Sequence, residues 1–187
     1  MKPVVVRNVA IGEAIPKICV PIVGKMIDEI LNQAKHICEI GADVVEWRVD
    51  WFEEVNNYES VENAAKQLRD ILEETPILFT FRTAKEGGER AIEPDEYVEL
   101  NEKIAKSGYV DLVDVEAFIG DTYVEKVVKT SHECGVKVIA SNHDFRKTPP
   151  KAELISRMRK MQELGADISK IAVMPQSTED VLTLLSA

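Results

Sequence analysis

Lys170 lies within a short apolar run, Ile168–Val173, that is bounded by Gly165 and Pro175. A run of this length and β-branched composition between turn residues is typical of a buried parallel strand, where an ionised lysine is rarely tolerated. Because burial disfavours the ammonium form, we expect a lowered pKa for Lys170 and a free amine that attacks a carbonyl carbon. The alternative is a lysine at the mouth of the strand that pairs with a distant acid.

Further ionisable residues stand at the ends of the strands predicted before this one. They are Glu46, Arg48, Arg82, Asp114, Glu116 and His143. Because alternate residues of a strand share a face and the carboxyl ends of parallel strands meet at one edge, we expect these side chains to converge on Lys170. A lysine nucleophile, a histidine acid/base and arginine anion clamps are the groups needed for imine chemistry on an anionic ketone. Taken singly, each residue also has a structural explanation, as a member of an ion pair or as a hydrogen-bonded loop histidine.

The elements that would position these residues alternate regularly between helix and strand. Helical periodicity is clear over 26–38, where apolar residues recur every three to four positions and Gly41 follows as a stop. The predicted helices cover 26–38, 61–72, 94–105, 123–133 and 149–164, and a last helix begins near Ser177. The predicted strands cover 18–23, 44–49, 77–81, 110–115, 136–140 and 168–173.

This order predicts parallel strands joined by helical crossovers, and therefore an α/β sheet or a (β/α)8 TIM barrel. A hairpin over 4–13, with its turn near Asn8, precedes the first strand. We count six βα units in 187 residues, whereas a closed barrel typically needs about 250 residues. We therefore predict one catalytic domain over residues 1–187 that is incomplete, and we expect the chain to be a truncated part of a longer barrel.

The composition narrows the classes of function. With 45% apolar and 30% charged residues the chain is an ordinary globular protein, and its net charge of -10 argues against binding to nucleic acid or acidic membranes. No apolar run is long enough to cross a bilayer and no signal-peptide pattern follows Met1, so we expect a cytoplasmic protein. Cys19, Cys38 and Cys134 have neither disulfide nor zinc spacing and are predicted to be buried thiols.

Four segments of the sequence resemble a known family. They are Glu46-Trp47-Arg48-Val49-Asp50, Phe79-Thr80-Phe81-Arg82 running into Glu86-Gly87-Gly88, Ser141-Asn142-His143-Asp144-Phe145, and the stretch from Gly165 to Pro175 around Lys170. In this order they resemble the type I 3-dehydroquinate dehydratases of the shikimate pathway, which leads to chorismate and the aromatic amino acids. The resemblance covers essentially the whole chain.

The resemblance implies a (β/α)8 barrel, usually a homodimer, that needs no metal or organic cofactor. The implied reaction converts 3-dehydroquinate to 3-dehydroshikimate and water through a lysine Schiff base. The Schiff base is assigned to Lys170, general acid/base catalysis to His143, and the orientation of His143 to Glu86. The resemblance also implies substrate contacts from three residues, Glu46, Arg48 and Arg82.

Two departures from the family pattern stand out. Pro21 lies in the first strand where many relatives have a hydroxyl-bearing substrate contact, and proline has no side-chain donor. The last two βα units of the family barrel, whose loops supply another arginine for the substrate carboxylate, lie outside these 187 residues.

Three other interpretations compete with this one. A class I aldolase or transaldolase-like Schiff-base lyase shares the lysine, so only the other segments discriminate against it. A metal-dependent sugar isomerase would use carboxylates and an imidazole as ligands, namely Glu46, Asp114, Glu116 and His143. The third interpretation is a non-catalytic truncated remnant that binds or regulates.

Overall fold

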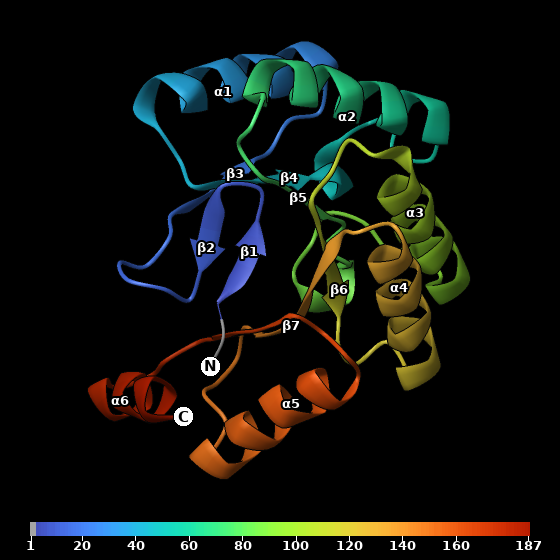
Figure 1. Cartoon of the computed structure of the whole chain (residues 1–187). Coiled ribbons are helices and arrows are strands. Elements are labelled where there is room, and N and C mark those ends of the chain that lie inside the picture. Colours follow the sequence, from blue (N-terminus) through green and yellow to red (C-terminus); the bar gives the residue numbers. More distant parts are fainter. Residues whose placement is uncertain (1–2) are drawn as a thin grey trace.

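The computed structural model describes residues 3–187 as a curled parallel sheet with helices on its outer face and a small hairpin (Figure 1). The strand order follows the chain, and all the pairings in this sheet are parallel. The strands are β3 (Cys19–Ile22), β4 (Val44–Arg48), β5 (Ile77–Thr80), β6 (Leu112–Glu116), β7 (Lys137–Asp144) and β8 (Ile168–Val173). The helices that follow them are α1 (Ile27–Ile40), α2 (Tyr58–Leu72), α3 (Pro94–Ser107), α4 (Asp121–Glu133), α5 (Lys151–Glu163) and α6 (Thr178–Ser186).

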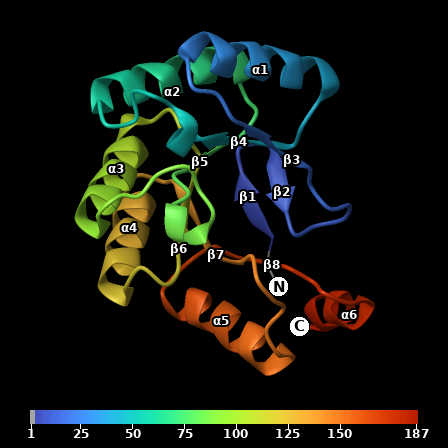
Figure 2. The same cartoon turned by 180° about the vertical axis from the view of Figure 1, so that it is seen from behind.

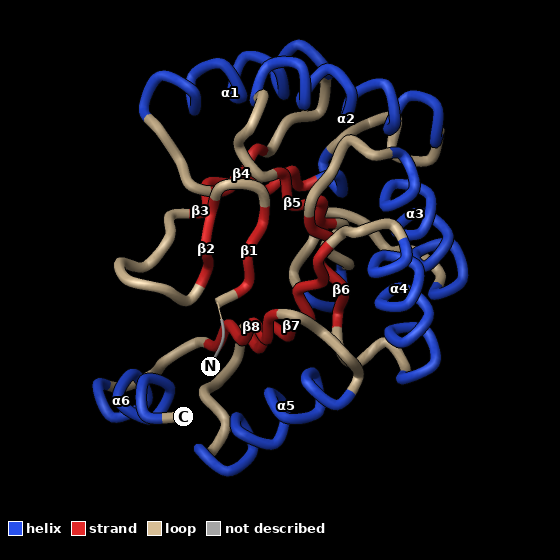
Figure 3. The backbone as a smooth tube through the Cα atoms, viewed as in Figure 1, coloured by secondary structure: helices blue, strands red, loops and turns tan. Residues whose placement is uncertain are grey.

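Helices α1 to α5 form an outer arc around the strands (Figure 3), and each of them has buried residues that pack towards the sheet. The buried residues of α2 recur at the three- and four-residue spacing that places side chains on one face, and they are Val61, Ala64, Ala65, Leu68 and Leu72. Every residue of β5 and β6 is buried as well. Polar side chains on the inner face of these two strands are therefore held inside the molecule.

The hairpin, β1 (Val4–Val6) and β2 (Val9–Ile11), lies inside the arc of helices (Figures 1 and 2). It packs against the amino ends of the sheet strands, where Val6 shares a buried cluster with Val44, Leu78, Leu112 and Ile139. This apolar cluster closes the amino end of the curled sheet. The carboxyl end is the one left for polar side chains, as in other parallel α/β folds.

The six βα units and the hairpin before them confirm the predicted barrel architecture. The observed β8 has the predicted bounds, whereas β7 continues past Ala140 to Asp144. Pairing with β8 extends this far, since Asp144 lies opposite Val173. As a result His143 stands in a strand and not in a loop. Over residues 3–187 no helix is both long and apolar enough to cross a membrane.

The prediction of buried thiols is wrong. Cys19, Cys38 and Cys134 are all exposed. Among the described residues the strand of Cys19, β3, pairs on one side alone, with β4. Cys134 caps the C-terminal end of α4, where the chain turns at Gly135. The apolar character of a residue does not bury it when it stands on an edge strand or at the end of a helix.

Candidate active site

The amine of Lys170 lies on the inner side of the curled sheet, next to two carboxylates. Its Nζ is 2.8 Å from Asp114 Oδ2 and 3.6 Å from Glu46 Oε1. Thr80 holds Glu46 in place, because its Oγ1 donates to Glu46 Oε1 at 2.8 Å. The Lys170 side chain is 33% exposed while that of Asp114 is fully buried. The amine therefore stands between the carboxylates and solvent.

These carboxylates reverse the expected pKa shift of Lys170. Burial by itself lowers its pKa, but Asp114 and Glu46 outweigh burial and raise the pKa above its ordinary value of 10.5. The prediction of a lowered pKa is therefore wrong in this structure, and the alternative of a lysine paired with an acid applies. The sequence around Lys170 contains no such partner because both acids come from other strands, β4 and β6.

Arg82 joins the same network from the end of β5, where it is buried. Its Nη2 donates to Asp114 Oδ1 at 2.7 Å, and its Nη1 donates to Glu116 Oε1 at 3.0 Å and to Ser141 Oγ at 2.9 Å. Glu116 also accepts hydrogen bonds from the backbone N and the Oγ1 of Thr83, at 2.8 and 2.7 Å. A planar guanidinium satisfies several acceptors at once, so Arg82 joins Asp114 and Glu116 into one rigid wall.

Glu86 and His143 form a second group beside this wall. Glu86 ends the short 3₁₀ helix η2 (Ala84–Glu86), and its Oε2 accepts from the backbone N and the Nδ1 of His143, both at 2.9 Å. A carboxylate can only accept, so Nδ1 carries the proton and Nε2 of the neutral ring keeps a free lone pair. Phe145 stacks on the imidazole with the ring centroids 6.2 Å apart. The ring is thus oriented to take up a proton at Nε2.

Two glycines shape the turn that carries Glu86. Gly87 has a φ of 84°, in the left-handed region, and a β-carbon there would lie 2.4 Å from the Phe145 ring. At Gly88 a β-carbon would lie 1.8 Å from the carbonyl oxygen of Arg82. Glycine is the residue that fits both places, and the tight turn brings Glu86 within reach of His143.

Arg48 is held by a different acid. Its Nε donates to Asp50 Oδ1 and its Nη2 donates to Asp50 Oδ2, both at 2.8 Å, which makes a bidentate pair. Asp50 is buried and also accepts from the backbone N of Arg82 and of Glu89, at 3.3 and 3.1 Å. Asp50 therefore ties the end of β4 to the loop that follows β5, while the Arg48 side chain stays partly exposed.

The structure brings most of the predicted site residues together. Lys170, Glu46 and Arg82 share the network around Asp114, and the pair of Glu86 and His143 lies next to it, with Arg82 Nη1 3.8 Å from Glu86 Oε2. Arg48 pairs with Asp50, whereas Glu46, which shares its face of β4, faces Lys170.

Sequence reasoning missed four polar residues that hold these groups. They are Asp50, Thr80, Ser141 and Asn142. All four stand at or beside the carboxyl end of a strand, within two positions of a residue that was predicted for the site. Their position at the end of a predicted strand is the feature of the sequence from which they could have been predicted.

The residues considered as metal ligands do not converge on one point. Arg82 bridges Asp114 and Glu116, and Glu46 faces the amine of Lys170. Within residues 3–187 no group of three His, Cys, Asp or Glu side chains is arranged to hold a metal ion. The arrangement of cations between carboxylates favours chemistry at the amine over a metal-dependent isomerisation.

The ionisation of Asp114 makes the stability of the fold depend on pH in acid. Burial raises its pKa, but Arg82 and Lys170 outweigh burial and lower the pKa from 3.8 to about 2. A carboxylate with a depressed pKa stabilises the fold above its ordinary pKa, and this contribution is lost as the pH falls from 3.8 towards 2.

We predict that Asp114→Asn lowers the free energy of unfolding at neutral pH by about 3–5 kcal/mol, because it removes the buried carboxylate that Arg82 and Lys170 both contact. The difference from wild type should shrink as Asp114 becomes protonated in acid. Urea unfolding at a series of pH values measures both effects. A difference that stays constant with pH would contradict the assignment of the depressed pKa to Asp114.

Comparison with known proteins finds relatives of the whole chain. The model of the type I 3-dehydroquinase family matches residues 18–187. A 3-dehydroquinate dehydratase of Listeria monocytogenes is 56% identical over 187 residues, which are 100% of this chain and 74% of the relative. The type I 3-dehydroquinate dehydratase of Clostridium difficile, solved with covalently modified comenic acid, is 51% identical with a TM-score of 0.97, over 99% of this chain and 73% of that chain. The 3-dehydroquinate dehydratase of Geobacillus kaustophilus is 42% identical with a TM-score of 0.96, over 99% of this chain and 72% of that chain.

Proposed function

Because the chain belongs to the type I 3-dehydroquinate dehydratase family, whose members convert 3-dehydroquinate to 3-dehydroshikimate and water through a Schiff base, we propose that Lys170 and His143 carry the reaction. The observation that carries this assignment is the place of Lys170, a partly exposed side chain whose amine lies beside two carboxylates. In the register of β7 and β8, Lys170 lies opposite Ser141, which shares its face of the strand with His143. The Clostridium difficile relative was solved with covalently modified comenic acid, which supports the presence of a nucleophile in that relative.

The first step is attack of Lys170 Nζ on the ketone carbon of the substrate. Nζ must first lose a proton, because an ammonium has no lone pair to donate. The carbonyl oxygen then leaves as water, and the nitrogen becomes positively charged again in the iminium. Asp114 and Glu46 are placed to stabilise the positive charge of both the ammonium and the iminium.

His143 carries the proton transfers that follow. Its Nε2 removes the proton at C2, and the iminium accepts the electron pair of that C–H bond to give an enamine. The enamine expels the C1 hydroxyl, which the same histidine protonates, so that it leaves as water. Glu86 stabilises the imidazolium formed in between, because its carboxylate holds Nδ1–H. Hydrolysis of the remaining imine releases 3-dehydroshikimate and frees Lys170.

Glu46, Arg48 and Arg82 are proposed to contact the anionic, hydroxyl-rich substrate. Arg82→Lys should lower both kcat/KM and the free energy of unfolding, because an ammonium cannot replace several buried charge-assisted hydrogen bonds of about 1.5–3 kcal/mol each. Arg48→Lys should raise KM with a smaller effect on stability, since Arg48 is partly exposed. Steady-state kinetics and urea unfolding of the two variants measure these effects. Wild-type kcat/KM in both variants would contradict the proposed substrate contacts.

Three expectations from the sequence stay predictions. They are a homodimer, a cytoplasmic location and a single catalytic domain over residues 1–187. Sedimentation velocity tests the first, since a homodimer has twice the mass of its chain. Cell fractionation tests the second, and limited proteolysis, which cuts between domains before it cuts within them, tests the third.

A further inference from the structure

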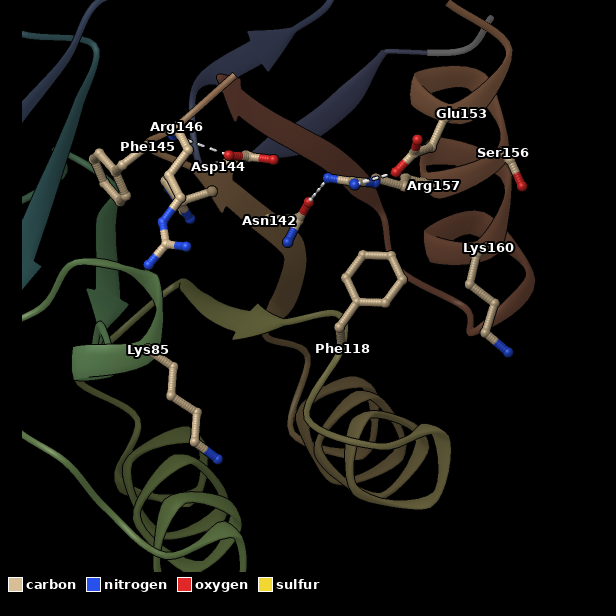
Figure 4. A pocket seen from close by; sticks show the side chains of 11 residues that line it. Lys85, Phe118, Asn142, Asp144, Phe145, Arg146, Glu153, Ser156, Arg157 and Lys160 are labelled. Carbon is tan, nitrogen blue, oxygen red and sulfur yellow. Dashed lines mark hydrogen bonds and ion pairs between the residues drawn. The ribbon is translucent and has the colours of Figure 1, made fainter. Parts of the chain in front are cut away.

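A chain of hydrogen bonds runs from helix α5 to the carboxylate of Glu86. Arg157 Nη1 donates to Asn142 Oδ1 at 2.7 Å, as Figure 4 shows, and Asn142 Nδ2 donates to Glu86 Oε1 at 3.0 Å. The other carboxylate oxygen of Glu86, Oε2, accepts from His143. Glu86 is therefore held at one oxygen by the histidine and at the other by the asparagine amide.

The two ends of this chain determine how the amide of Asn142 is oriented. A carboxylate only accepts hydrogen bonds and a guanidinium only donates them. Asn142 can link Glu86 to Arg157 in one way, with its NH₂ group towards the carboxylate and its oxygen towards the guanidinium. The opposite charges at the two ends polarise the amide between them, which strengthens both hydrogen bonds.

Arg157 is itself held by neighbouring side chains. It forms an ion pair with Glu153, one turn earlier on α5, and its Cζ lies 6.0 Å from the centre of the Phe118 ring. Figure 4 shows Glu153 and Asn142 at the two ends of the guanidinium. The Arg157 side chain is 19% exposed, so the chain of hydrogen bonds begins at a restrained group on a helix.

Glu86 has a competing partner close by. Nη1 of Arg82 lies 3.8 Å from Glu86 Oε2, the oxygen that orients the imidazole. If Asn142 did not hold Oε1, the carboxylate would be free to rotate towards the guanidinium and away from His143. The amide of Asn142 opposes this rotation because its Nδ2 donates a hydrogen bond to Oε1, the other oxygen of the Glu86 carboxylate.

We propose that Asn142 and Arg157 are positioning residues that keep the Glu86 carboxylate in the place where it orients His143. The inference rests on the acid/base role proposed for His143. Asn142 and Arg157 then affect proton transfer and leave imine formation at Lys170 intact. They act on the histidine through Glu86.

The first test is steady-state kinetics. Asn142→Leu keeps the shape of the side chain without its polar atoms, and it should lower kcat about 10-fold to 100-fold while KM changes less than about 3-fold. Borohydride should still trap an adduct on Lys170. Arg157→Met should lower kcat about 5-fold, and Arg157→Lys, which retains a donor, should recover most of this loss. The matched control is Arg159→Met, which removes an exposed cation from the same helix and should leave kcat unchanged.

A double-mutant cycle distinguishes positioning from a general loss of structure. In a Glu86→Gln background, Asn142→Leu should lower kcat by less than about 3-fold, because the group through which it acts is already altered. An equal loss in both backgrounds, a wild-type kcat in Asn142→Leu, or loss of the trapped adduct would overturn the inference. Failure of the proposed function would appear separately, as a near-normal kcat in His143→Ala.

Discussion

Lys170→Ala is expected to abolish turnover together with the covalent adduct that borohydride fixes between the enzyme and 3-dehydroquinate. Borohydride reduces an iminium to a stable secondary amine, so the adduct reports the Schiff base directly. Alanine removes the nucleophile, and binding and fixed charges alone do not replace it, so kcat should fall by about 10⁴-fold or more. Intact-mass spectrometry followed by peptide mapping measures the adduct and locates it in the protein.

Two other lysines provide controls for this result. Lys147 follows β7, and Lys151 begins α5, so both lie near the same end of the sheet as the proposed site. Lys147→Ala and Lys151→Ala should keep the adduct, because neither lysine belongs to the network around Asp114. A reduced adduct mapped to Lys147 or Lys151 would show that the nucleophile has been assigned to the wrong residue.

His143→Ala is expected to separate imine formation from proton transfer. The adduct on Lys170 should still form, more slowly than in wild type, whereas turnover should fall by about 10²-fold to 10⁴-fold, the usual contribution of a positioned acid/base. Single-turnover trapping with borohydride measures the adduct, and the appearance of 3-dehydroshikimate measures turnover.

Glu86→Gln is the companion variant. Glutamine retains an oxygen that can accept from Nδ1 of His143, but it lacks the charge that stabilises the imidazolium. Its loss of turnover should therefore be smaller than that of His143→Ala. Near-normal kcat in His143→Ala would eliminate the histidine from the mechanism, whatever the glutamine variant does.

Local patterns in the sequence were enough to predict the elements of the fold. Apolar periodicity and the glycines that follow helices indicated the six βα units, and the strand over 168–173 has the predicted bounds. The convergence of polar side chains followed from the rule that parallel strands end at one edge of the sheet. These predictions depend on residues that are close together in the chain.

The partners of each site residue could not be predicted in the same way. Lys170 on β8 contacts Asp114 on β6 across the intervening strand β7, whose Ser141 pairs with Lys170. Such a contact depends on strand register and on side-chain rotamers, which no short segment encodes. The same holds for Arg157, whose contact with Asn142 depends on how α5 is rotated over the sheet. The sign of the Lys170 pKa shift was wrong because the prediction considered burial alone, although Glu46 and Asp114 were expected to converge on the same edge of the sheet.

The wall around Lys170 holds more negative than positive charge. Carboxylates of Glu46, Asp114 and Glu116 face the cations Arg82 and Lys170. The excess of negative charge grows when the ammonium gives up its proton, so an anionic ketone approaches the protonated form at least electrostatic cost. The protonated form of Lys170 is therefore the one that favours the arrival of an anionic substrate. The same excess of negative charge keeps Lys170 protonated, and therefore unreactive towards other electrophiles in solution, until its proton is removed during the reaction.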